Sequence, residues 1–243
     1  MQQPSDHEYN GVLLIDKPSG ITSHDVVDRV RKCLKMRKVG HAGTLDPNAT
    51  GLMLILVGKG TKISQFLMSK DKTYTGVIQL GLETDSYDID GEVLVQNHPA
   101  PIDSGVIEKA MAKFIGDQYQ KPPMFSAKKI KGVPLYKHAR KGKEVEREER
   151  LIRIHSFSLT QNDFPDLHFE ISVSKGTYIR SVAHDLGQAL GTGACLTVLR
   201  RTKISDFSIE KAIKLDDLPS MASNMIKSRL IPIYQAVPSH VLS

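Results

Sequence analysis

The 243-residue sequence predicts an α+β fold, in which helices and strands are interspersed without strict alternation. Two segments alternate apolar and polar residues with the period of a strand, at 72–81 and at 167–173. A long stretch with helical and basic character separates them. Strands that pair across such an interval fit an α+β arrangement better than a doubly wound parallel sheet.

The first part of the chain predicts a strand, a helix, a polar loop and a second buried segment. Residues 11–16 are a short apolar run closed by Lys17-Pro18-Ser19-Gly20, which is typical of a buried strand ending in a turn. A helix follows, with Ser23 as its expected N-cap, an apolar stripe from Val26 to Leu34 and a strongly basic outer face. Residues 40–51 are too rich in Gly, Asn and Pro for a regular element, and 52–57 form an apolar strand or buried helical turn.

The remainder predicts helices near 106–115 and 181–190, with a basic excursion between them. That excursion, 121–150, contains ten Lys or Arg residues and three prolines with little apolar periodicity, which favours a mobile segment. After about residue 211 the chain offers strand- and helix-sized pieces without a core of their own. We therefore expect residues 1–243 to form a single catalytic domain with a short carboxyl-terminal extension at about 211–243.

Composition restricts the class of protein. The formal charge is +6 and the pI about 9.2, which suggests an anionic partner. The two cysteines, Cys33 and Cys195, are too few for a disulfide framework or a Cys-rich zinc site and fit a reducing compartment. There is no signal-peptide pattern and no apolar run of the ~20 residues that a membrane helix needs, so we expect a cytoplasmic protein that does not engage membranes.

Several common chemistries are excluded by motif. The sequence contains no HExxH pair, no clustered Cys/His ligands and no GxSxG elbow. The run Gly58-Lys59-Gly60-Thr61 resembles the end of a phosphate loop, but the glycine required five residues earlier is replaced by Met53. A nucleoside triphosphate site is therefore not expected.

Candidate functional residues lie in the polar loop and in the segment before the second helix. Asp46 stands between flexible glycines and Pro47, where it is either a fixed nucleophile or the acceptor of an Asx-turn. His41 is either a ligand contact or a loop histidine bonded to backbone. Tyr178 and Arg180 are two residues apart on a segment expected to be extended, so both would project from one face.

Two further candidates carry structural alternatives of similar weight. Tyr74 alternates onto the apolar face of its strand and is either a core aromatic or a ligand platform. Lys17, before Pro18, is either a phosphate contact or a solvated lysine. A buried Arg180 would need a carboxylate partner, for which Asp46 is a candidate.

The wording of the polar loop carries a family resemblance. Gly40-His41-Ala42-Gly43-Thr44-Leu45-Asp46-Pro47-Asn48-Ala49-Thr50-Gly51 resembles the signature of the bacterial tRNA pseudouridine synthase B (TruB) family. Four further segments match in the same order and extend the resemblance over roughly 11–210: they lie at 14–23, 72–76, 122–127 and 176–181. The resemblance implies a pseudouridine synthase fold, with a long, mixed, mostly antiparallel sheet flanked by helices and a basic thumb insertion.

The resemblance also implies a reaction and residue roles. The enzyme would convert uridine 55 in the T-loop of tRNA to pseudouridine, with Asp46 as nucleophile, Tyr74 stacked on the target base and Arg180 paired with Asp46. His41, Tyr178 and the backbone around Leu199 would contact the flipped nucleotide or its loop, and Lys17-Pro18 would support the wall of the site. The excursion at 121–150 would be the thumb that closes over the RNA. No metal, organic cofactor or guide RNA is implied, and we expect a monomer.

One departure from the family and three alternatives remain. Many bacterial members continue into a small carboxyl-terminal RNA-binding domain, which we expect to be truncated or missing here, with weaker tRNA binding as the consequence. A nucleotidyltransferase shares the Gly-Thr-x-Asp-Pro wording of 43–47, but its motif demands a histidine after the next glycine, where this chain has Leu52. An RNA-binding or RNA-folding protein without essential catalysis, and a guide-RNA-dependent ribosomal RNA modifier, are the other two.

Overall fold

The computed structural model describes residues 9–125, 129–130, 133–134, 145 and 147–241. The chain divides into two compact units, each with its own core: unit 1 comprises residues 1–73 and 200–243, and unit 2 comprises residues 74–199. Unit 2 is thus inserted between two chain segments that build unit 1. The expectation that residues 1–243 form a single domain stays a prediction.

Unit 1 is built around a strand pair buried on both faces. β1 (Gly11–Lys17) runs antiparallel to β3 (Thr50–Val57), which settles the 52–57 segment as a strand. Residues on both faces of these strands are buried, as the pairs Leu13 and Leu14 in β1 and Met53 and Leu54 in β3 show. The neighbouring strands are β2 (Val39–His41), β13 (Phe207–Ser208), β14 (Ile213–Lys214) and residues 200–204 of β12 (Ala194–Ile204).

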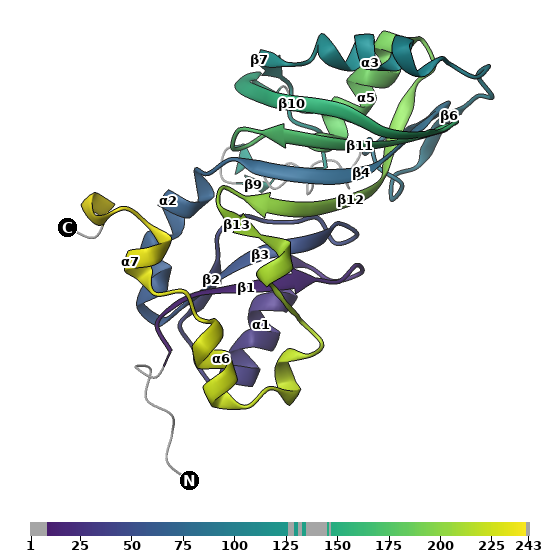
Figure 1. The fold of residues 1–243 in the computed structure, drawn as a ribbon. Helices are drawn as coiled ribbons and strands as arrows, with labels where there is room; N and C mark the ends of the chain where they lie inside the picture. The colour runs from purple at the N-terminus through teal and green to yellow at the C-terminus, as the bar shows by residue number, and fades with distance from the viewer. Residues whose placement is uncertain (1–8, 126–128, 131–132, 135–144, 146, 242–243) are drawn as a thin grey trace. The chain divides into compact units, whose positions relative to one another are not determined.

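Helix α1 (Ser23–Leu34) buries the predicted stripe of Val26, Val27, Val30 and Leu34 against unit 1 (Figure 1). Its N-cap is Thr22 rather than the expected Ser23. Thr22 and Asp25 form a capping box, in which each side chain accepts a hydrogen bond from the other residue's backbone N–H. The other helical segments of unit 1 are η1 (Gly58–Ile63), α2 (Ser64–Met68), η2 (Ile209–Lys211), η3 (Leu218–Ser220), α6 (Ser223–Arg229), α7 (Ile233–Ala236) and η4 (Ser239–Val241).

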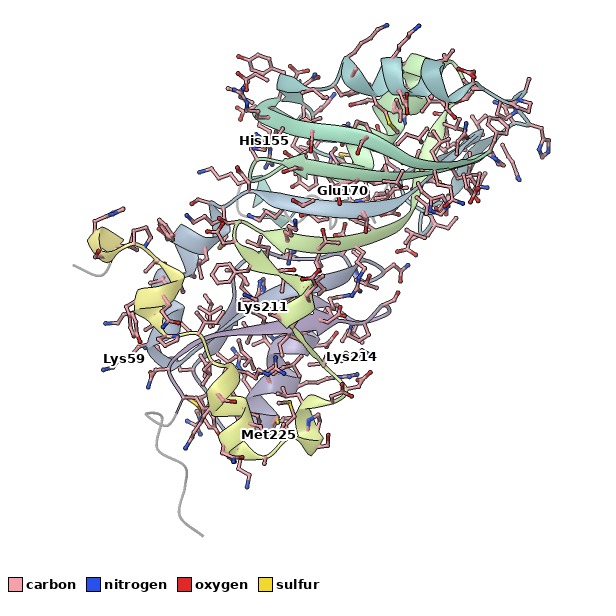
Figure 2. The ribbon with its side chains drawn as sticks, in the orientation of Figure 1. Lys59, His155, Glu170, Lys211, Lys214 and Met225 are labelled. Carbon is pink, nitrogen blue, oxygen red and sulfur yellow. The ribbon has the colours of Figure 1, made fainter. Side chains whose placement is uncertain are left out.

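The strands of unit 2 have one covered face and one exposed face. β10 (Arg150–Asp163) pairs in antiparallel fashion with β11 (Asp166–Val173) and with β7 (Gly116–Gln120). In Figure 2, His155 on β10 and Glu170 on β11 project from the strands, and both are exposed. The remaining strands are β4 (Lys72–Leu80) beside β11, residues 194–199 of β12, and the short pairs β5 (Leu82–Thr84) with β6 (Val93–Gln96) and β8 (Lys129–Ile130) with β9 (Val133–Pro134).

Helices α3 (Ser104–Ala112) and α5 (Ile179–Leu190) pack together and cover the apolar face of unit 2 (Figure 1). Their buried residues, such as Met111 and Leu186, meet the alternating apolar residues of β10 and β11. Phe157 packs edge-on against Phe169 with ring centroids 5.8 Å apart. The described strands are mixed but mostly antiparallel and flanked by helices, which confirms the predicted α+β class.

Three further expectations from the sequence concern the start of α5, the basic excursion and membrane-spanning helices. Arg180 lies in the first turn of α5, so Tyr178 and Arg180 do not form the extended dipeptide predicted. Much of the basic excursion at 121–150 falls outside the described residues, and its proposed closing motion stays a prediction. Within the described residues, no helix combines the length and the apolar character needed to cross a bilayer.

Candidate active site

Asp46 lies exposed in the irregular segment between β2 and β3. Together with the first three residues of β3, Thr50–Leu52, this segment from Gly43 onward is called the 43–52 loop. Its neighbours in the loop, Leu45 and Ala49, are buried and tie the backbone to unit 1. The backbone N–H of Ala49 donates to the carbonyl of Asp46 at 3.1 Å, which closes a turn around the carboxylate. The loop therefore presents one carboxylate to solvent from an anchored backbone.

Lys17, at the end of β1, holds the backbone of this loop through hydrogen bonds. Its side chain is fully buried, and its ammonium group donates to the carbonyls of Pro47 and Ala49 at 2.7 Å each and to that of Pro18 at 3.0 Å. Three N–H donors are all that a lysine has. Lys17 is therefore neither solvated nor positioned for the phosphate contact considered from the sequence, and it supports the loop instead.

Burial lowers the pKa of Lys17 from 10.5 to about 8, an effect that the charge of Arg201 adds to and that of Asp46 opposes. The ammonium is thus mostly protonated at neutral pH, although its environment penalises the charge. Its hydrogen bonds to carbonyl dipoles offset part of that penalty.

Ser23 holds the loop through reciprocal hydrogen bonds to a single residue. Its hydroxyl accepts from the backbone N–H of Leu45 at 2.8 Å and donates to the carbonyl of Leu45 at 2.9 Å. This long-range role explains why Thr22, and not Ser23, caps α1. The backbone of the residue directly before Asp46 in sequence is thereby fixed to the start of α1.

Arg201, on β12, contacts the loop at both ends. Its Nε donates to the carbonyl of Leu52 at 2.7 Å, and its two terminal nitrogens donate to the carbonyls of Thr44 at 3.3 Å and Gly43 at 3.2 Å. Arg201 is 1% exposed. The parallel pairing of Arg201 with Gly51 requires glycine there, because a Cβ at Gly51, where φ is +105°, would overlap the backbone of Arg201.

His41 closes the amino-terminal side of this region at the end of β2. Burial lowers the pKa of His41, and the positive charge of Arg201 lowers it further, so the ring is neutral at pH 7. Its Nδ1 is buried and has no hydrogen-bond partner among the described residues. The contact of His41 with the nucleotide, expected from the sequence, stays a prediction.

In unit 2, Arg180 is buried in a cradle of oxygen atoms. The guanidinium lies 3.2 Å from a carboxylate oxygen of Asp88 and donates to the carbonyls of Ser86 at 3.2 Å and Phe125 at 2.8 Å. The arginine side chain is 7% exposed and that of Asp88 is 18% exposed. The sequence argument that a buried Arg180 needs a carboxylate is satisfied within unit 2 by Asp88, a residue that it did not single out.

Asp88 belongs to an acidic segment, 84–92, that is closed by its own side chains. The carboxylate of Asp88 accepts from the hydroxyl of Ser86, and Asp85 accepts from the backbone N–H of Glu92. Tyr87 has a left-handed backbone with φ of 65°, which is uncommon for a non-glycine residue. Its ring stacks on His184 of α5, with centroids 4.0 Å apart and planes 14° apart. The stack lies one helical turn beyond Arg180.

The other predicted site residues of unit 2 are Tyr178, Tyr74 and Leu199. Gln120 forms paired hydrogen bonds with the backbone N–H and carbonyl of Tyr178, and Arg150 stacks on the Tyr178 ring at 5.1 Å. Tyr74 lies on β4 and is 8% exposed. Leu199 is the last residue of unit 2, directly before the Arg200-Arg201 pair.

The predicted residues are divided between the two units. Lys17, His41 and Asp46 belong to unit 1, whereas Tyr74, Tyr178, Arg180 and Leu199 belong to unit 2. The expected pairing of Asp46 with Arg180 joins the two groups and stays a prediction. Sequence reasoning missed Ser23, Asp88 and Arg201 as parts of these sites, and the available signals were the unusual arginine pair on β12 and the acidic run at 85–92.

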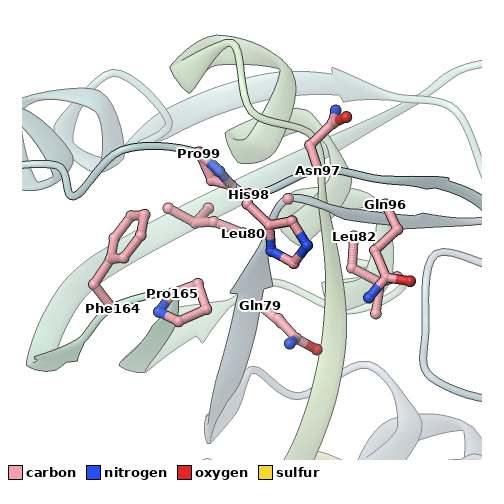
Figure 3. A pocket seen from close by; sticks show the side chains of 10 residues that line it. Gln79, Leu80, Leu82, Gln96, Asn97, His98, Pro99, Phe164 and Pro165 are labelled. Carbon is pink, nitrogen blue, oxygen red and sulfur yellow. The ribbon is translucent and has the colours of Figure 1, made fainter.

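A separate cavity of about 170 Å³ lies in unit 2 at the other end of β4 (Figure 3). Its lining includes Leu80, His98, Phe164 and Pro165, and none of the predicted site residues. Gln79 and Leu80 are five and six residues beyond Tyr74, or roughly 17–20 Å along an extended strand. We assign this cavity no part in the reaction.

Comparisons with known proteins agree on one family. Residues 31–179 match the model of the TruB family pseudouridylate synthase, N-terminal domain, and residues 180–237 match that of the tRNA pseudouridylate synthase B C-terminal domain. The chain is 56% identical over 234 residues to tRNA pseudouridine synthase B of Opitutus terrae, covering 96% of this chain and 97% of that protein. It is 43% identical to the protein of the same name in Syntrophotalea carbinolica, covering 94% of this chain and 74% of that protein.

Solved structures give the same fold. A chain in a Cbf5-Nop10-Gar1 complex is similar with a TM-score of 0.76 at 29% identity over 95% of this chain. A chain in an H/ACA RNP bound to a substrate RNA containing 2′-deoxyuridine is similar with a TM-score of 0.71 at 26% identity over 98% of this chain. The present chain spans 62% and 63% of the length of those two chains.

Proposed function

Because the chain belongs to the TruB family of pseudouridylate synthases and forms pseudouridine in tRNA, we propose that its target is uridine 55 of the T-loop. The observation that carries the assignment of Asp46 is its position: an exposed carboxylate on a loop whose backbone is held by buried Lys17, Ser23 and Arg201. A reaction that needs one fixed, accessible carboxylate is served by this arrangement.

The proposed reaction is an isomerisation. The N1–C1′ glycosidic bond of the target uridine breaks, the uracil turns while it stays bound, and C5 joins C1′ as C5 loses its proton and N1 gains one. Asp46 captures or stabilises the electron-poor centre that forms, by adding to C6 of the base, by attacking C1′ of the ribose or by assisting a glycal route. No atom is gained or lost overall, so the reaction calls for neither oxidant nor co-substrate.

We propose that Arg180 pairs with Asp46 in the RNA-bound enzyme while Asp88 keeps hold of the same guanidinium. A guanidinium has five N–H donors in a planar fork, so a single arginine can contact two carboxylates at once. The pairing would orient the carboxylate and keep it ionised, as a nucleophile requires.

Tyr74 and His41 are proposed to receive the extruded base. Removing a base from its stack costs a few kcal/mol, and stacking on an aromatic ring returns roughly 1–3 kcal/mol. Tyr74 is 8% exposed, so the base must come to the ring at the surface of unit 2. The neutral His41 would contact the nucleotide or its loop.

Basic residues on α1 and on the 121–150 excursion are proposed to bind phosphates of the T-arm. On α1 two arginines are already paired with carboxylates, Arg29 with Asp216 at 3.1 Å and Arg31 with Asp28 at 2.9 Å. These pairs are half-exposed and would exchange partners readily in the presence of a polyanion. Recognition then rests on the folded shape of the RNA loop.

The test is incubation of purified protein with an unmodified tRNA transcript, without guide RNA or nucleotide, followed by mapping of pseudouridine at nucleotide resolution. We expect one pseudouridine, at position 55, and none in a transcript with cytidine at that position. Asp46→Asn should lower the rate by more than about 1,000-fold, because the amide is not a nucleophile, while tRNA affinity changes little.

Three outcomes would contradict the proposal. Modification at another position would assign a different target, and a requirement for an added guide RNA would favour the guide-dependent alternative. Full activity of Asp46→Asn would remove the carboxylate from the mechanism. If the inactive Asp46→Asn protein promotes tRNA folding as well as wild type does, a folding role coexists with catalysis.

A further inference from the structure

Arg201 is a buried cation whose contacts are unusual. Arg201 is among the largest fully buried side chains described, and its guanidinium donates only to carbonyls, those of Gly43, Thr44 and Leu52. No carboxylate is within ion-pair distance of it among the described residues, in contrast to Arg180 and Arg200. A buried charge without an opposite charge is unfavourable for stability, so its presence calls for a compensating purpose.

The position of its three acceptors supplies that purpose. Gly43 and Thr44 lie at the start of the 43–52 loop, and Leu52 lies at its end. The guanidinium of Arg201 therefore contacts the backbone both before and after Asp46. Lys17 contacts the middle of the loop, at Pro47 and Ala49, and Ser23 contacts Leu45. The attachments are distributed over the loop without sharing an acceptor.

The geometry of arginine suits this task better than that of lysine. The fixed fork of a guanidinium sets the directions of its donors relative to one another, whereas an ammonium on a flexible stem does not. The close approach of β12 to β3 at Gly51 places the guanidinium within reach of both ends of the loop. Arg201 therefore adds a side-chain link between the two ends, beyond the backbone pairing of β2 with β3 that already joins them.

We propose that Arg201 is a positioning residue for the nucleophile Asp46. It holds both ends of the 43–52 loop so that the carboxylate stays in the orientation needed for attack. The proposal rests on the proposed function of the loop and adds a residue that contacts neither substrate nor the reacting atoms. Displacing a catalytic group by about 1 Å is sufficient to lower a rate by about 100-fold, which sets the expected effect.

The experiment compares Arg201→Lys and Arg201→Gln with Leu218→Ala. Lysine keeps the charge and one donor group, and glutamine keeps two donors without the charge. Leu218 is 1% exposed in η3 of unit 1 and touches none of the three loop carbonyls, so Leu218→Ala lowers stability by leaving a cavity elsewhere. For each protein we would measure thermal stability, the tRNA dissociation constant and the single-turnover rate at saturating tRNA, per folded molecule.

We expect both Arg201 variants to lose about 100-fold in single-turnover rate with tRNA affinity within about threefold of wild type, Arg201→Lys less than Arg201→Gln. Leu218→Ala should keep the wild-type rate while it is folded. A rate within about threefold of wild type in either Arg201 variant would overturn the proposal. So would an equal rate loss in Leu218→Ala, because the effect would then follow stability alone.

Hydrogen exchange of the wild-type protein tests the same idea without a substitution. If Arg201 holds the loop rigidly, the amides of Leu45 and Ala49 should exchange only with global unfolding of unit 1, at the rate of Leu54 in β3. Exchange of the loop amides much faster than that of Leu54 would overturn the proposal, even if neither Arg201 variant can be purified. If wild-type protein forms no pseudouridine, the proposed function fails, and exchange of the loop amides much faster than that of Leu54 would still overturn the role of Arg201 on its own.

Discussion

The 43–52 loop of unit 1 and the 84–92 segment of unit 2 both fix an irregular stretch of backbone beside a charged residue, and they do so with opposite chemistry. In unit 1 buried cations donate to backbone carbonyls, and the carboxylate of Asp46 is left exposed. In unit 2 the carboxylates of Asp88 and Asp85 accept hydrogen bonds from a hydroxyl and a backbone N–H, and the cation Arg180 is buried against Asp88 and two backbone carbonyls. The key charge is thus an exposed carboxylate in unit 1 and a buried cation in unit 2.

The difference teaches which losses each site tolerates. Carbonyls that lose a donor remain neutral and destabilise the loop moderately. A buried guanidinium that loses its carboxylate keeps an uncompensated charge, which is a larger effect. Substitutions in the two regions should therefore separate changes in rate from changes in stability.

Among the substitutions that compare the supports of the two charges, the largest effect is expected from Asp88→Asn in unit 2. The amide keeps the shape of the side chain and removes the charge that faces Arg180, so the guanidinium should shift within its cradle. We expect the single-turnover rate to fall by about 100-fold, with little change in tRNA affinity. The matched control is Asp85→Asn. Asp85 closes the same segment by accepting from the backbone N–H of Glu92, and it does not contact Arg180. Equal losses in both variants would mean that the segment, and not the charge of Asp88, is what matters.

A smaller effect is expected from Lys17→Met in unit 1, seen in the pH dependence of stability. The pKa of Lys17 is lowered from 10.5 to about 8, so between these values the unfolded chain holds a proton that the folded protein has released. Wild-type stability should therefore gain from this site as pH rises from about 8 to 10.5 and lose it again as pH falls. Relative to Lys17→Met, the unfolding free energy of wild type should rise by on the order of 2–3 kcal/mol across that window.

Urea unfolding of both proteins at several pH values measures that difference. Lys59, an exposed lysine of the same unit (Figure 2), provides the control Lys59→Met, for which the difference from wild type should stay flat. A flat difference for Lys17→Met as well would show that burial of the ammonium does not alter its protonation. The contrast between the two regions would then no longer rest on a destabilised buried cation in unit 1.

The smallest expected effect is that of His184→Ala, which removes the ring stacked on Tyr87. Aromatic pairs contribute about 0.5–1.5 kcal/mol beyond burial, so unit 2 should lose about 1 kcal/mol of stability. The rate should fall by less than about tenfold, because Asp88 still holds Arg180. His184→Phe keeps a stacking partner and should restore both values. Failure of phenylalanine to restore them would indicate that the imidazole nitrogen, and not the ring face, supports Tyr87.

Much of the fold could be predicted because periodicity reports burial directly. The alternation in 167–173 and the apolar stripe of α1 were sufficient to place β11 and that helix. β10 was not predicted, because register shifts interrupt its alternation and leave His155 and Ser156 exposed in succession. Arg180 was placed on an extended segment because the cap of α5 at Tyr178 uses no side-chain hydrogen bond that a sequence would announce.

The site was predicted in part. The wording of the loop pointed to Asp46, but the residues that hold it are scattered over β1, α1 and β12, and no local pattern links them. Lys17 was expected at the surface because lysine is rarely buried, and here three carbonyls compensate for its burial. The roles of Tyr74, Tyr178 and Leu199 toward RNA stay predictions.

The inserted arrangement of unit 2 has a consequence for synthesis of the chain. The 43–52 loop leaves the ribosome early, whereas Arg201 follows only after the whole of unit 2. A nascent chain that lacks residue 201 has Lys17, Ser23 and the pairing of β2 with β3 to hold the loop, but it lacks the contacts of Arg201 with the carbonyls of Gly43, Thr44 and Leu52. The loop that carries Asp46 therefore acquires its full set of hydrogen bonds late, when most of the chain has been made.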